Sequence, residues 1–267
     1  MRSKMENNRG AGAEPWQSKA LSEEKPVLNI LYQDEYLVAV DKPAGLFVHR
    51  SFMDKHEIYF ALQLVRDQIG QYVYPVHRLD RPTSGVLLFA LTEEVARQMG
   101  RLFTDKLVQK TYYALTRGYL QGEGLIDYPL KEKLDKLGDK GVSRDKPAQE
   151  AQTYYQGIET ASLPVALGKY ASVRYSLVKL LPQTGRRHQI RRHLAHLRHP
   201  IIGDINYGDN KQNPFFGEYF GFRRLMLMAK QVEFIHPITS NKLSIEAEFD
   251  SQWCEVFSKL QWELEGL

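Results

Sequence analysis

The stretch Pro75-Val76-His77-Arg78-Leu79-Asp80-Arg81-Pro82-Thr83-Ser84-Gly85 runs directly into the unbroken apolar segment Val86-Leu87-Leu88-Phe89-Ala90-Leu91. A short, continuous apolar run that follows Pro and Gly is typical of a buried strand. The next residues, Thr92-Glu93-Glu94, are typical of a helix N-terminus, because a threonine caps the first turn and acidic side chains favour it. The sequence therefore predicts a turn, a buried strand and a helix, in that order.

The turn places the carboxylate of Asp80 between Arg78 and Arg81, just outside the strand. Nearby guanidinium groups favour an ionised carboxylate, which suits nucleophilic or electrostatic work and makes Asp80 a poor general acid. In the alternative, Asp80 has only a structural role, capping the turn and pairing with an arginine at the surface. We expect the chemistry of this protein at Asp80, and the turn alone leaves the alternative open.

Length and composition exclude several classes of protein. The chain has 267 residues, 43% hydrophobic and 25% charged, which is enough for one large domain or two small ones. Cys254 is the only cysteine, so the chain forms no intramolecular disulfide and no multi-cysteine metal cage, which fits a cytoplasmic protein. No apolar run approaches the roughly 18 to 20 residues that cross a bilayer, so we expect no membrane partner.

Hydrophobic periodicity predicts an α+β fold with a mixed, largely antiparallel β-sheet and flanking helices. Residues 1–26 are polar and are predicted to be a disordered tail, followed by one domain over 27–267. Residues 128–152 are rich in Lys, Asp and Gly and are predicted to be an exposed insertion. The expected elements are a hairpin at 28–32 and 36–40, helices at 57–69, 93–103 and 253–262, and strands at 111–115, 171–181, 225–229, 232–235 and 242–249.

The segment Gln183 to His199 carries five arginines, four histidines and no acidic residue. Because the net charge of the whole chain is only +4, the rest of the chain is close to neutral. A concentrated arginine patch is expected of a phosphate-binding groove, and the alternative is a solvated helix face whose charges pair with acids elsewhere. Ile190, Leu194 and Leu197 recur at helical spacing, which predicts an apolar stripe facing inward and most arginines facing outward.

The four histidines of this segment, at positions 188, 193, 196 and 199, suggest zinc ligands as a rival hypothesis. The surrounding arginines oppose a dication, and the segment has no carboxylate or thiolate to offset them. No Gly-rich nucleotide-binding motif is present either. We therefore expect neither a metal site nor a cofactor.

Several motifs together resemble those of one enzyme family. His77-Arg78-Leu79-Asp80 with Thr83-Ser84-Gly85 resembles the signature of the RluA-type pseudouridine synthases. Further matching segments follow in the same order, and the resemblance spans about residues 27 to 250: Lys42-Pro43-Ala44-Gly45 with Val48-His49, Lys110 through Tyr112 to Ala114, Thr184-Gly185-Arg186, His188-Gln189-Ile190-Arg191 and Gly203-Asp204. Among the branches of the family, the chain is most similar to the tRNA pseudouridine synthase C type.

The resemblance implies the pseudouridine synthase catalytic fold with a central cleft, and isomerisation of uridine in RNA without metal or cofactor. The glycosidic bond is cut, uracil rotates, and C5 is joined to C1′. Asp80 matches the essential aspartate, whose proposed roles are nucleophilic addition to the sugar or base and proton abstraction from the sugar. Tyr112 matches the tyrosine that packs against the target base and is a candidate for removing the C5 proton. Arg191 matches the arginine that pairs with the catalytic carboxylate.

The same resemblance implies how RNA is bound. Arg78 matches the arginine that enters the space left by the displaced nucleotide, and Ile190 helps to line the base pocket. Further RNA contacts are expected at Arg186, Arg187, His188 and Arg192. We expect a monomeric or weakly associated cytoplasmic protein that acts on tRNA, at the uridine of position 65 in the T stem. A structured ribosomal RNA loop is the alternative substrate, and a non-catalytic RNA-binding module is the alternative class.

Overall fold

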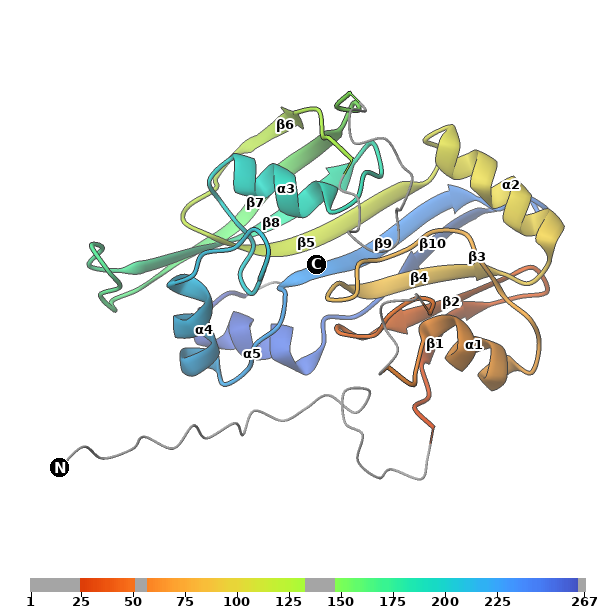
Figure 1. Cartoon of the computed structure of the whole chain (residues 1–267), viewed down its shortest axis with the longest axis horizontal. Helices are drawn as coiled ribbons and strands as arrows, with labels where there is room; N and C mark the ends of the chain where they lie inside the picture. Colours follow the sequence, from red (N-terminus) through yellow and green to blue (C-terminus); the bar gives the residue numbers. More distant parts are fainter. Residues whose placement is uncertain (1–24, 51–56, 133–146, 264–267) are drawn as a thin grey trace.

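A computed structural model of the chain describes residues 25–50, 57–132 and 147–263 (Figure 1). Its strands are β1 (Asn29–Gln33), β2 (Leu37–Lys42), β3 (Tyr74–Pro75), β4 (Ser84–Ala90), β5 (Gln109–Arg117), β6 (Glu123–Asp127), β7 (Gln152–Leu163), β8 (Val173–Pro182), β9 (Leu227–Ile235) and β10 (Lys242–Glu246). Its helices are α1 (Ala61–Ile69), α2 (Glu93–Thr104), α3 (Gln189–His196), α4 (Gln212–Phe220) and α5 (Ser251–Lys259).

The strands form one 10-stranded sheet in the order β1-β2-β4-β9-β5-β8-β7-β6, with β3 also beside β4 and β10 also beside β9. Every described pair is antiparallel except β4 with β9, which run parallel where Ser84 and Gly85 face Met228 and Ala229. The predicted α+β class with a mixed, largely antiparallel sheet is therefore confirmed.

The close crossing of β4 and β9 requires a glycine at position 85. Gly85 has φ +107, and a Cβ built on it would lie 2.1 Å from the carbonyl oxygen of Ala229. Any side chain there would meet the backbone of β9, in a backbone conformation that other residues rarely adopt. The glycine at the end of the opening motif is therefore fixed by sheet geometry.

Strand β4 is buried along its whole length, which explains the unbroken apolar run. Val86 and Leu88 belong to a core that also contains Met99 of α2, while Leu87 and Phe89 belong to a second core with helix α1. The hydroxyl of Thr92 accepts a hydrogen bond from the backbone N–H of Val95 at 3.3 Å. The predicted buried strand and capped helix are thus confirmed.

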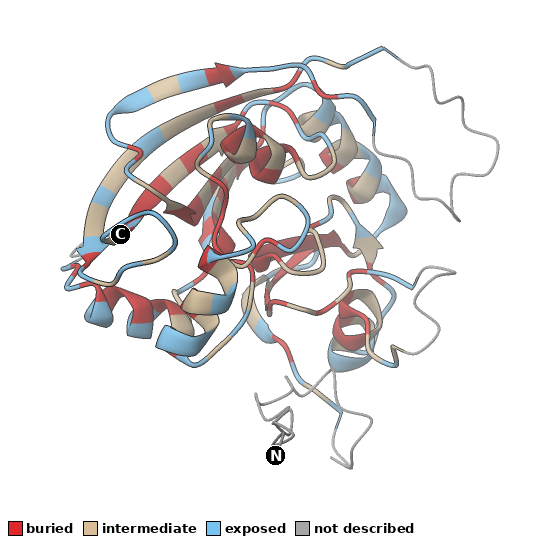
Figure 2. Cartoon of the chain, turned by 60° about the vertical axis from the view of Figure 1, so that its left-hand side comes forward, coloured by how far each residue is buried: buried red, intermediate tan, exposed pale blue. Residues whose placement is uncertain are grey.

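Helices α3, α4 and α5 cover the part of the sheet that comes after β4 in the strand order, from β9 to β6. Helix α3 lies across β7 and β8, and α4 and α5 lie together near one end of the sheet (Figure 1). Leu194, Phe216 and Trp253 bring these helices into the first core, and Figure 2 shows the buried positions on the central strands and the adjoining sides of helices. None of the helices in the described ranges has the length and apolarity needed to cross a membrane.

Several predicted boundaries were wrong for identifiable reasons. The helix expected from residue 57 begins at Ala61, because the backbone N–H groups of Ala61 and Leu62 bond to the carbonyls of residues 47 and 48. The strands expected at 225–229 and 232–235 are one strand, β9, held continuously by β5 and β10. The strand at 242–249 ends at residue 246, since Asp250 caps α5 by accepting from the N–H groups of residues 252 and 253. Strands β3, β6 and β7 and helix α4 were not predicted.

The insertion predicted at 128–152 lies partly outside the described residues, as do residues 1–24 of the predicted tail. At the described ends of the insertion, Leu130 and Gln149 exchange two backbone hydrogen bonds of 2.8 and 3.0 Å. Leu130 and Ala151 are buried, and Gln152 already begins β7. The ends of this segment are therefore docked on the fold.

Candidate active site

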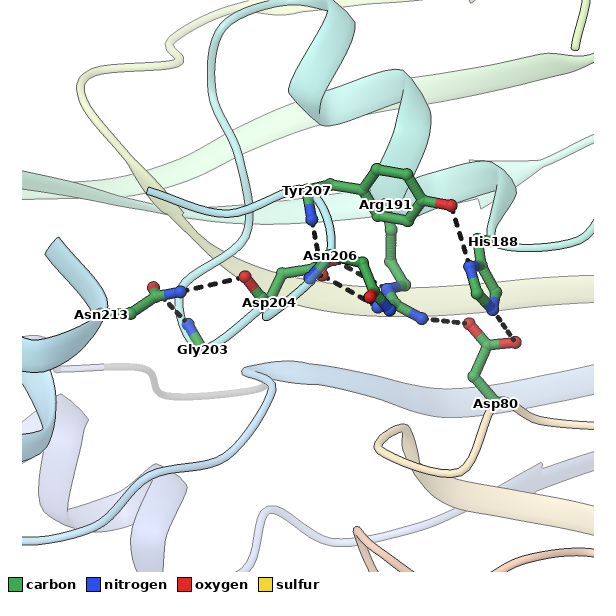
Figure 3. A network of polar contacts seen from close by, with 8 residues as sticks. All are labelled: Asp80, His188, Arg191, Gly203, Asp204, Asn206, Tyr207 and Asn213. Carbon is green, nitrogen blue, oxygen red and sulfur yellow. Dashed lines mark hydrogen bonds and ion pairs between the residues drawn. The ribbon is translucent and has the colours of Figure 1, made fainter. Parts of the chain in front are cut away.

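Asp80 and Arg191 meet where the loop before β4 lies close to the start of α3. Nη1 of Arg191 donates to Oδ2 of Asp80 at 3.1 Å, although the residues are 111 positions apart in sequence (Figure 3). The side chain of Arg191 is 3% exposed and that of Asp80 is 21% exposed. The expected pair is present, and the carboxylate remains partly accessible to another molecule.

A second carboxylate, that of Asp204, holds the other edge of the Arg191 guanidinium. Nε and Nη2 of Arg191 donate to the two oxygens of Asp204 at 2.7 and 2.9 Å. Burial alone would raise the pKa of Asp204, but the bonds from Arg191 and from the N–H groups of Asn206 and Tyr207 outweigh it and lower the pKa. Asp204 therefore stays ionised and fixes Arg191 with its remaining nitrogen directed at Asp80.

The loop that carries Asp204 is held in place by local contacts. Gly203 has φ +78, and a Cβ there would lie 1.6 Å from the carbonyl oxygen of Arg224. The side chain of Asn213 accepts from the N–H of Gly203 at 2.9 Å and donates to the carbonyl of Asp204 at 3.0 Å. The sequence motif Gly203-Asp204 thus has a structural basis, although sequence reasoning assigned Asp204 no role.

His188 approaches Asp80 from the residue that precedes α3. Its Nε2 lies 3.8 Å from Oδ1 of Asp80, and its Nδ1 lies 3.0 Å from the hydroxyl of Tyr207. Burial lowers the pKa of His188, the cations Arg191 and Arg187 lower it further, and the charge of Asp80 opposes them. The imidazole is consequently neutral near pH 7. Sequence reasoning placed His188 in the site but missed Tyr207.

Gln189 fixes the turn that leads into α3. Its side-chain oxygen accepts from the Thr184 hydroxyl at 2.7 Å and from the N–H of Arg186 at 3.0 Å. Its amide nitrogen donates to the carbonyl of Gln152 at 2.9 Å and to the hydroxyl of Thr153 at 3.0 Å. This buried amide is fully bonded and ties the start of α3 to β7, which sets the position of Arg191.

Tyr112 lies on β5, next to the crossing that carries the Asp80 loop. It faces Ala229 of β9, which in turn faces Gly85 of β4. Burial raises the pKa of Tyr112 well above its usual value, and the negative charge of Asp80 raises it further. The phenol is therefore neutral in the free protein, which favours packing against a base over removal of a proton.

The two arginines that flank Asp80 in sequence, Arg78 and Arg81, have different surroundings, and Arg81 bonds to groups other than Asp80. Arg81 donates to Glu57 at 2.6 Å and to the carbonyl of Gly45 at 3.0 Å, and its guanidinium lies 4.4 Å from the ring centre of Phe47. Arg78 is exposed. The expectation that both flanking guanidinium groups stabilise Asp80 is wrong for Arg81, because Arg81 pairs with Glu57 and Arg191 of α3 contacts Asp80 instead.

The remaining basic residues of the arginine-rich segment have varied surroundings. Ile190 and Leu194 are buried as predicted, but Arg191 is buried with them and does not face outward. Arg186 donates to the carbonyl of Glu150 at 3.0 Å, and Arg192 donates to the carbonyl of Lys131 at 2.9 Å. Arg186 is exposed, whereas Arg187 and Arg192 are half-buried. The patch thus also secures the two ends of the segment predicted as an insertion.

Lys42 holds the backbone of the Asp80 loop through hydrogen bonds. It is fully buried, and its Nζ donates to the carbonyls of Pro43, Leu46 and Arg81 at 2.9, 2.9 and 3.1 Å. Burial, together with the nearby charge of Arg224, lowers the pKa of Lys42 to about 7. Three carbonyl acceptors nevertheless require three protons, which only the ammonium form carries. Lys42 therefore joins the turn at residues 43–46 to the loop of Asp80.

The four histidines that suggested zinc point to different partners. The ring nitrogens of His193 contact the hydroxyl of Thr153 and the carbonyl of Tyr128, while His196 stacks on the ring of Tyr128. His199 contacts the carbonyl of Arg117. Within the described ranges, no three His, Cys, Asp or Glu side chains come together in a way that could hold a metal ion. The geometry thus gives the zinc hypothesis no support.

Comparisons with known proteins identify the family of this chain. A family model described as RNA pseudouridylate synthase matches residues 36–196. The chain is 55% identical over 240 residues to "tRNA pseudouridine synthase C" of Pasteurella multocida, covering 90% of this chain and 99% of that protein. It is 53% identical over 237 residues to the protein of the same name from Haemophilus influenzae, covering 89% and 99%. The solved structure "Human RNA Pseudouridylate Synthase Domain Containing 4" has a TM-score of 0.65 and 27% identity, covering 88% of this chain and 94% of that chain. The chain therefore belongs to the RNA pseudouridylate synthase family, as the RluA-type resemblance predicted.

Proposed function

We propose that this protein converts uridine to pseudouridine in tRNA. The observation that carries the proposal is the partly exposed carboxylate of Asp80, held 3.1 Å from a buried arginine that a second carboxylate fixes in place. A carboxylate paired with a fixed guanidinium and oriented in this way suits nucleophilic attack or proton abstraction.

The reaction is an isomerisation in which every atom is retained. The bond between N1 and C1′ breaks, the bond between C5 and C1′ forms, C5 loses a proton and N1 gains one. The step therefore needs no oxidant or reductant. Asp80 acts on the sugar or the base in one of the ways that the family resemblance implies, and the hydrogen bond from Arg191 orients its carboxylate for all of them.

The other predicted residues have positions that fit supporting roles. Tyr112, half-buried beside the Asp80 loop, supplies an aromatic surface against which the target base packs. Arg78 is exposed two positions before Asp80, where its guanidinium is available to replace the displaced base in the stem. Ile190 lies beside Arg191 and lines the base pocket, while Arg186, Arg187 and Arg192 contact phosphates.

The substrate assignment rests on relatives. Proteins named tRNA pseudouridine synthase C, at 51 to 55% identity over about nine tenths of this chain, support tRNA as the substrate. The specific target that we propose is the uridine at position 65, in the T stem. The protein acts as a monomer in the cytoplasm, where tRNA is found.

Exchange of Asp80 for Asn tests the proposal. Wild type and Asp80→Asn are incubated with tRNA labelled with tritium at C5 of uridine, and pseudouridine formation is followed as tritium released to water. We expect Asp80→Asn to lose at least about 10³-fold in turnover while it still binds tRNA, because Asn keeps the size of the side chain but not its charge. Asp105→Asn, at the exposed end of α2, is the matched control and keeps wild-type turnover.

The substrate and its position are tested in the same assay. A tRNA with cytidine at position 65 should release no tritium, whereas release at an unchanged rate would show that another uridine is the target. A ribosomal RNA fragment is the second substrate to compare. Binding of tRNA by the wild type without any pseudouridine formation would support a non-catalytic RNA-binding module instead.

A further inference from the structure

The imidazole of His188 lies between the hydroxyl of Tyr207 and the carboxylate of Asp80 (Figure 3). Nδ1 is 3.0 Å from the hydroxyl of Tyr207, and Nε2 is 3.8 Å from Oδ1 of Asp80. Arg191 donates to the other oxygen of Asp80, Oδ2. Both carboxylate oxygens are therefore approached from α3 and the residue before it, each by a different side chain.

Electrostatics decide which nitrogen of His188 carries the proton. The ring is neutral near pH 7, so it has one N–H group and one lone pair. A proton on Nδ1 would direct the lone pair of Nε2 at the negative carboxylate, whereas a proton on Nε2 places a donor there. The second arrangement requires a donor facing Nδ1, and the hydroxyl of Tyr207 supplies it. The backbone N–H of Tyr207 is itself held by Asp204 at 3.1 Å.

The backbone at His188 is also unusual. His188 has φ 55 and ψ 28, in the left-handed region that few residues other than glycine adopt. The neighbouring Gln189 anchors this turn to β7 through its side chain. A rarely populated conformation that the surrounding structure enforces is often linked to function, and here it accompanies an imidazole directed at Asp80.

We propose that His188 is a positioning residue for Asp80. Oriented by Tyr207, it presents its Nε2–H to Oδ1 of Asp80 and, together with Arg191, fixes the rotation of the carboxylate. The contact of 3.8 Å in the free protein shortens to a hydrogen bond when the bound nucleotide excludes water. This inference rests on the proposed function, and it gives His188 a role that differs from the RNA contact predicted from the sequence.

Three substitutions separate positioning from RNA binding. In His188→Asn the side chain tolerates the left-handed backbone, but its amide ends near the place of Nδ1 and does not reach Asp80. In His188→Gln the amide nitrogen reaches the place of Nε2. Tyr207→Phe removes only the hydroxyl that orients the ring. The matched control is Tyr154→Phe, which removes an exposed hydroxyl on β7 that contacts Glu123, away from Asp80.

The measurements are kcat, KM and the Kd for tRNA with the proposed substrate. We expect His188→Asn to lower kcat on the order of tenfold, the size of one charge-assisted hydrogen bond, with KM and Kd within about twofold of wild type. His188→Gln recovers part of this loss. Tyr207→Phe lowers kcat several-fold and adds little when combined with His188→Asn, because the two residues act as one unit. Tyr154→Phe keeps the wild-type kcat.

Three outcomes would overturn the proposal. A rise in KM and Kd with unchanged kcat would make His188 an RNA contact, and an unchanged kcat in His188→Asn would remove it from the reaction. Equal losses in His188→Asn and His188→Gln would exclude the donor role. Thermal unfolding confirms that each variant is folded, and Tyr207→Phe tests the same chain of contacts without changing the backbone of His188. Turnover by the wild type tests the proposed function separately.

Discussion

Exchange of Asp204 for Asn should damage both stability and activity, although Asp204 does not touch the carboxylate of Asp80 in the contacts described. Asp204 accepts two bonds from Arg191 and two from the backbone N–H groups of Asn206 and Tyr207. In Asp204→Asn the remaining oxygen still accepts the backbone bonds, but an amide nitrogen then faces the Nε–H of Arg191. The N–H of the Asn amide and the Nε–H of Arg191 then face each other with no acceptor between them. Among the described contacts, Asp80 is left as the one anionic partner of Arg191.

The size of the effect follows from burial. The side chains of Arg191 and Asp204 are 3% and 1% exposed, so water cannot replace the lost partner. Removal of one member of a buried ion pair costs about 3 to 5 kcal/mol in the free energy of unfolding. At about 2 to 4 °C per kcal/mol for a protein of this size, the melting temperature should fall by roughly 6 to 20 °C. The kcat should fall as well, because Arg191 no longer holds a fixed orientation.

Asp209→Asn is the matched control for this prediction. Asp209 also accepts two backbone N–H groups, those of Lys211 and Gln212, and pairs with an arginine, Arg117, at 2.5 Å. Its side chain is 23% exposed, and that of Arg117 is 35% exposed, so this pair should contribute only about 1 kcal/mol or less. Urea unfolding followed by tryptophan fluorescence measures both variants. A loss in Asp204→Asn no larger than that in Asp209→Asn would refute the reasoning.

Three further predictions concern the fold and the binding of RNA. Burial lowers the pKa of His77 to about 4, and its Nε2 accepts from the N–H of Leu88 at 3.0 Å. Because His77 in the unfolded chain binds a proton already near pH 6.5, the free energy of unfolding should fall by about 3 kcal/mol between pH 6.5 and 4. The variant His77→Gln keeps an acceptor for Leu88 but does not titrate, so its free energy of unfolding should lack this fall. Gly85→Ala should destabilise the protein by at least about 3 kcal/mol in a urea titration, because its Cβ would meet the carbonyl of Ala229. The matched control is Gly100→Ala in helix α2, where a Cβ would have nothing within 4 Å, and this variant should be more stable than wild type by about 0.5 to 1 kcal/mol. The Kd for tRNA should rise steeply with salt because phosphate contacts release counterions, and an affinity that is independent of salt in filter binding would contradict this.

The sequence predicted the local parts of the fold well. The apolar run of β4 and the cap at Thr92 depend on neighbouring residues, so periodicity and capping rules identified them. Strand β7 was missed because its 12 residues mix buried and exposed positions without regular alternation. The start of α1 was misplaced because residues 47 and 48, distant in sequence, bind the backbone that would have begun the helix.

Sequence motifs identified part of the candidate site, and the rest depends on contacts between residues that are far apart in sequence. Asp80 and Arg191 were identified from separate motifs, and the structure brings them together. Asp204 was quoted only as part of a Gly-Asp pair, and an acidic residue after a glycine gives no sign that it will meet an arginine 13 positions earlier. Arg81 was expected at Asp80 because it is adjacent in sequence, yet the turn directs its side chain toward Glu57.

The order of strands in the sheet has a consequence for biosynthesis. Strand β9, from Leu227 to Ile235, lies between β4 and β5, so the sheet that holds the Asp80 loop close to Arg191 cannot form before residue 235 has been synthesised. Translation proceeds from the N-terminus, and a polypeptide still attached to the ribosome is surrounded by RNA. A nascent chain that ends before β9 therefore carries Asp80 on a loop that the sheet does not yet hold beside Arg191.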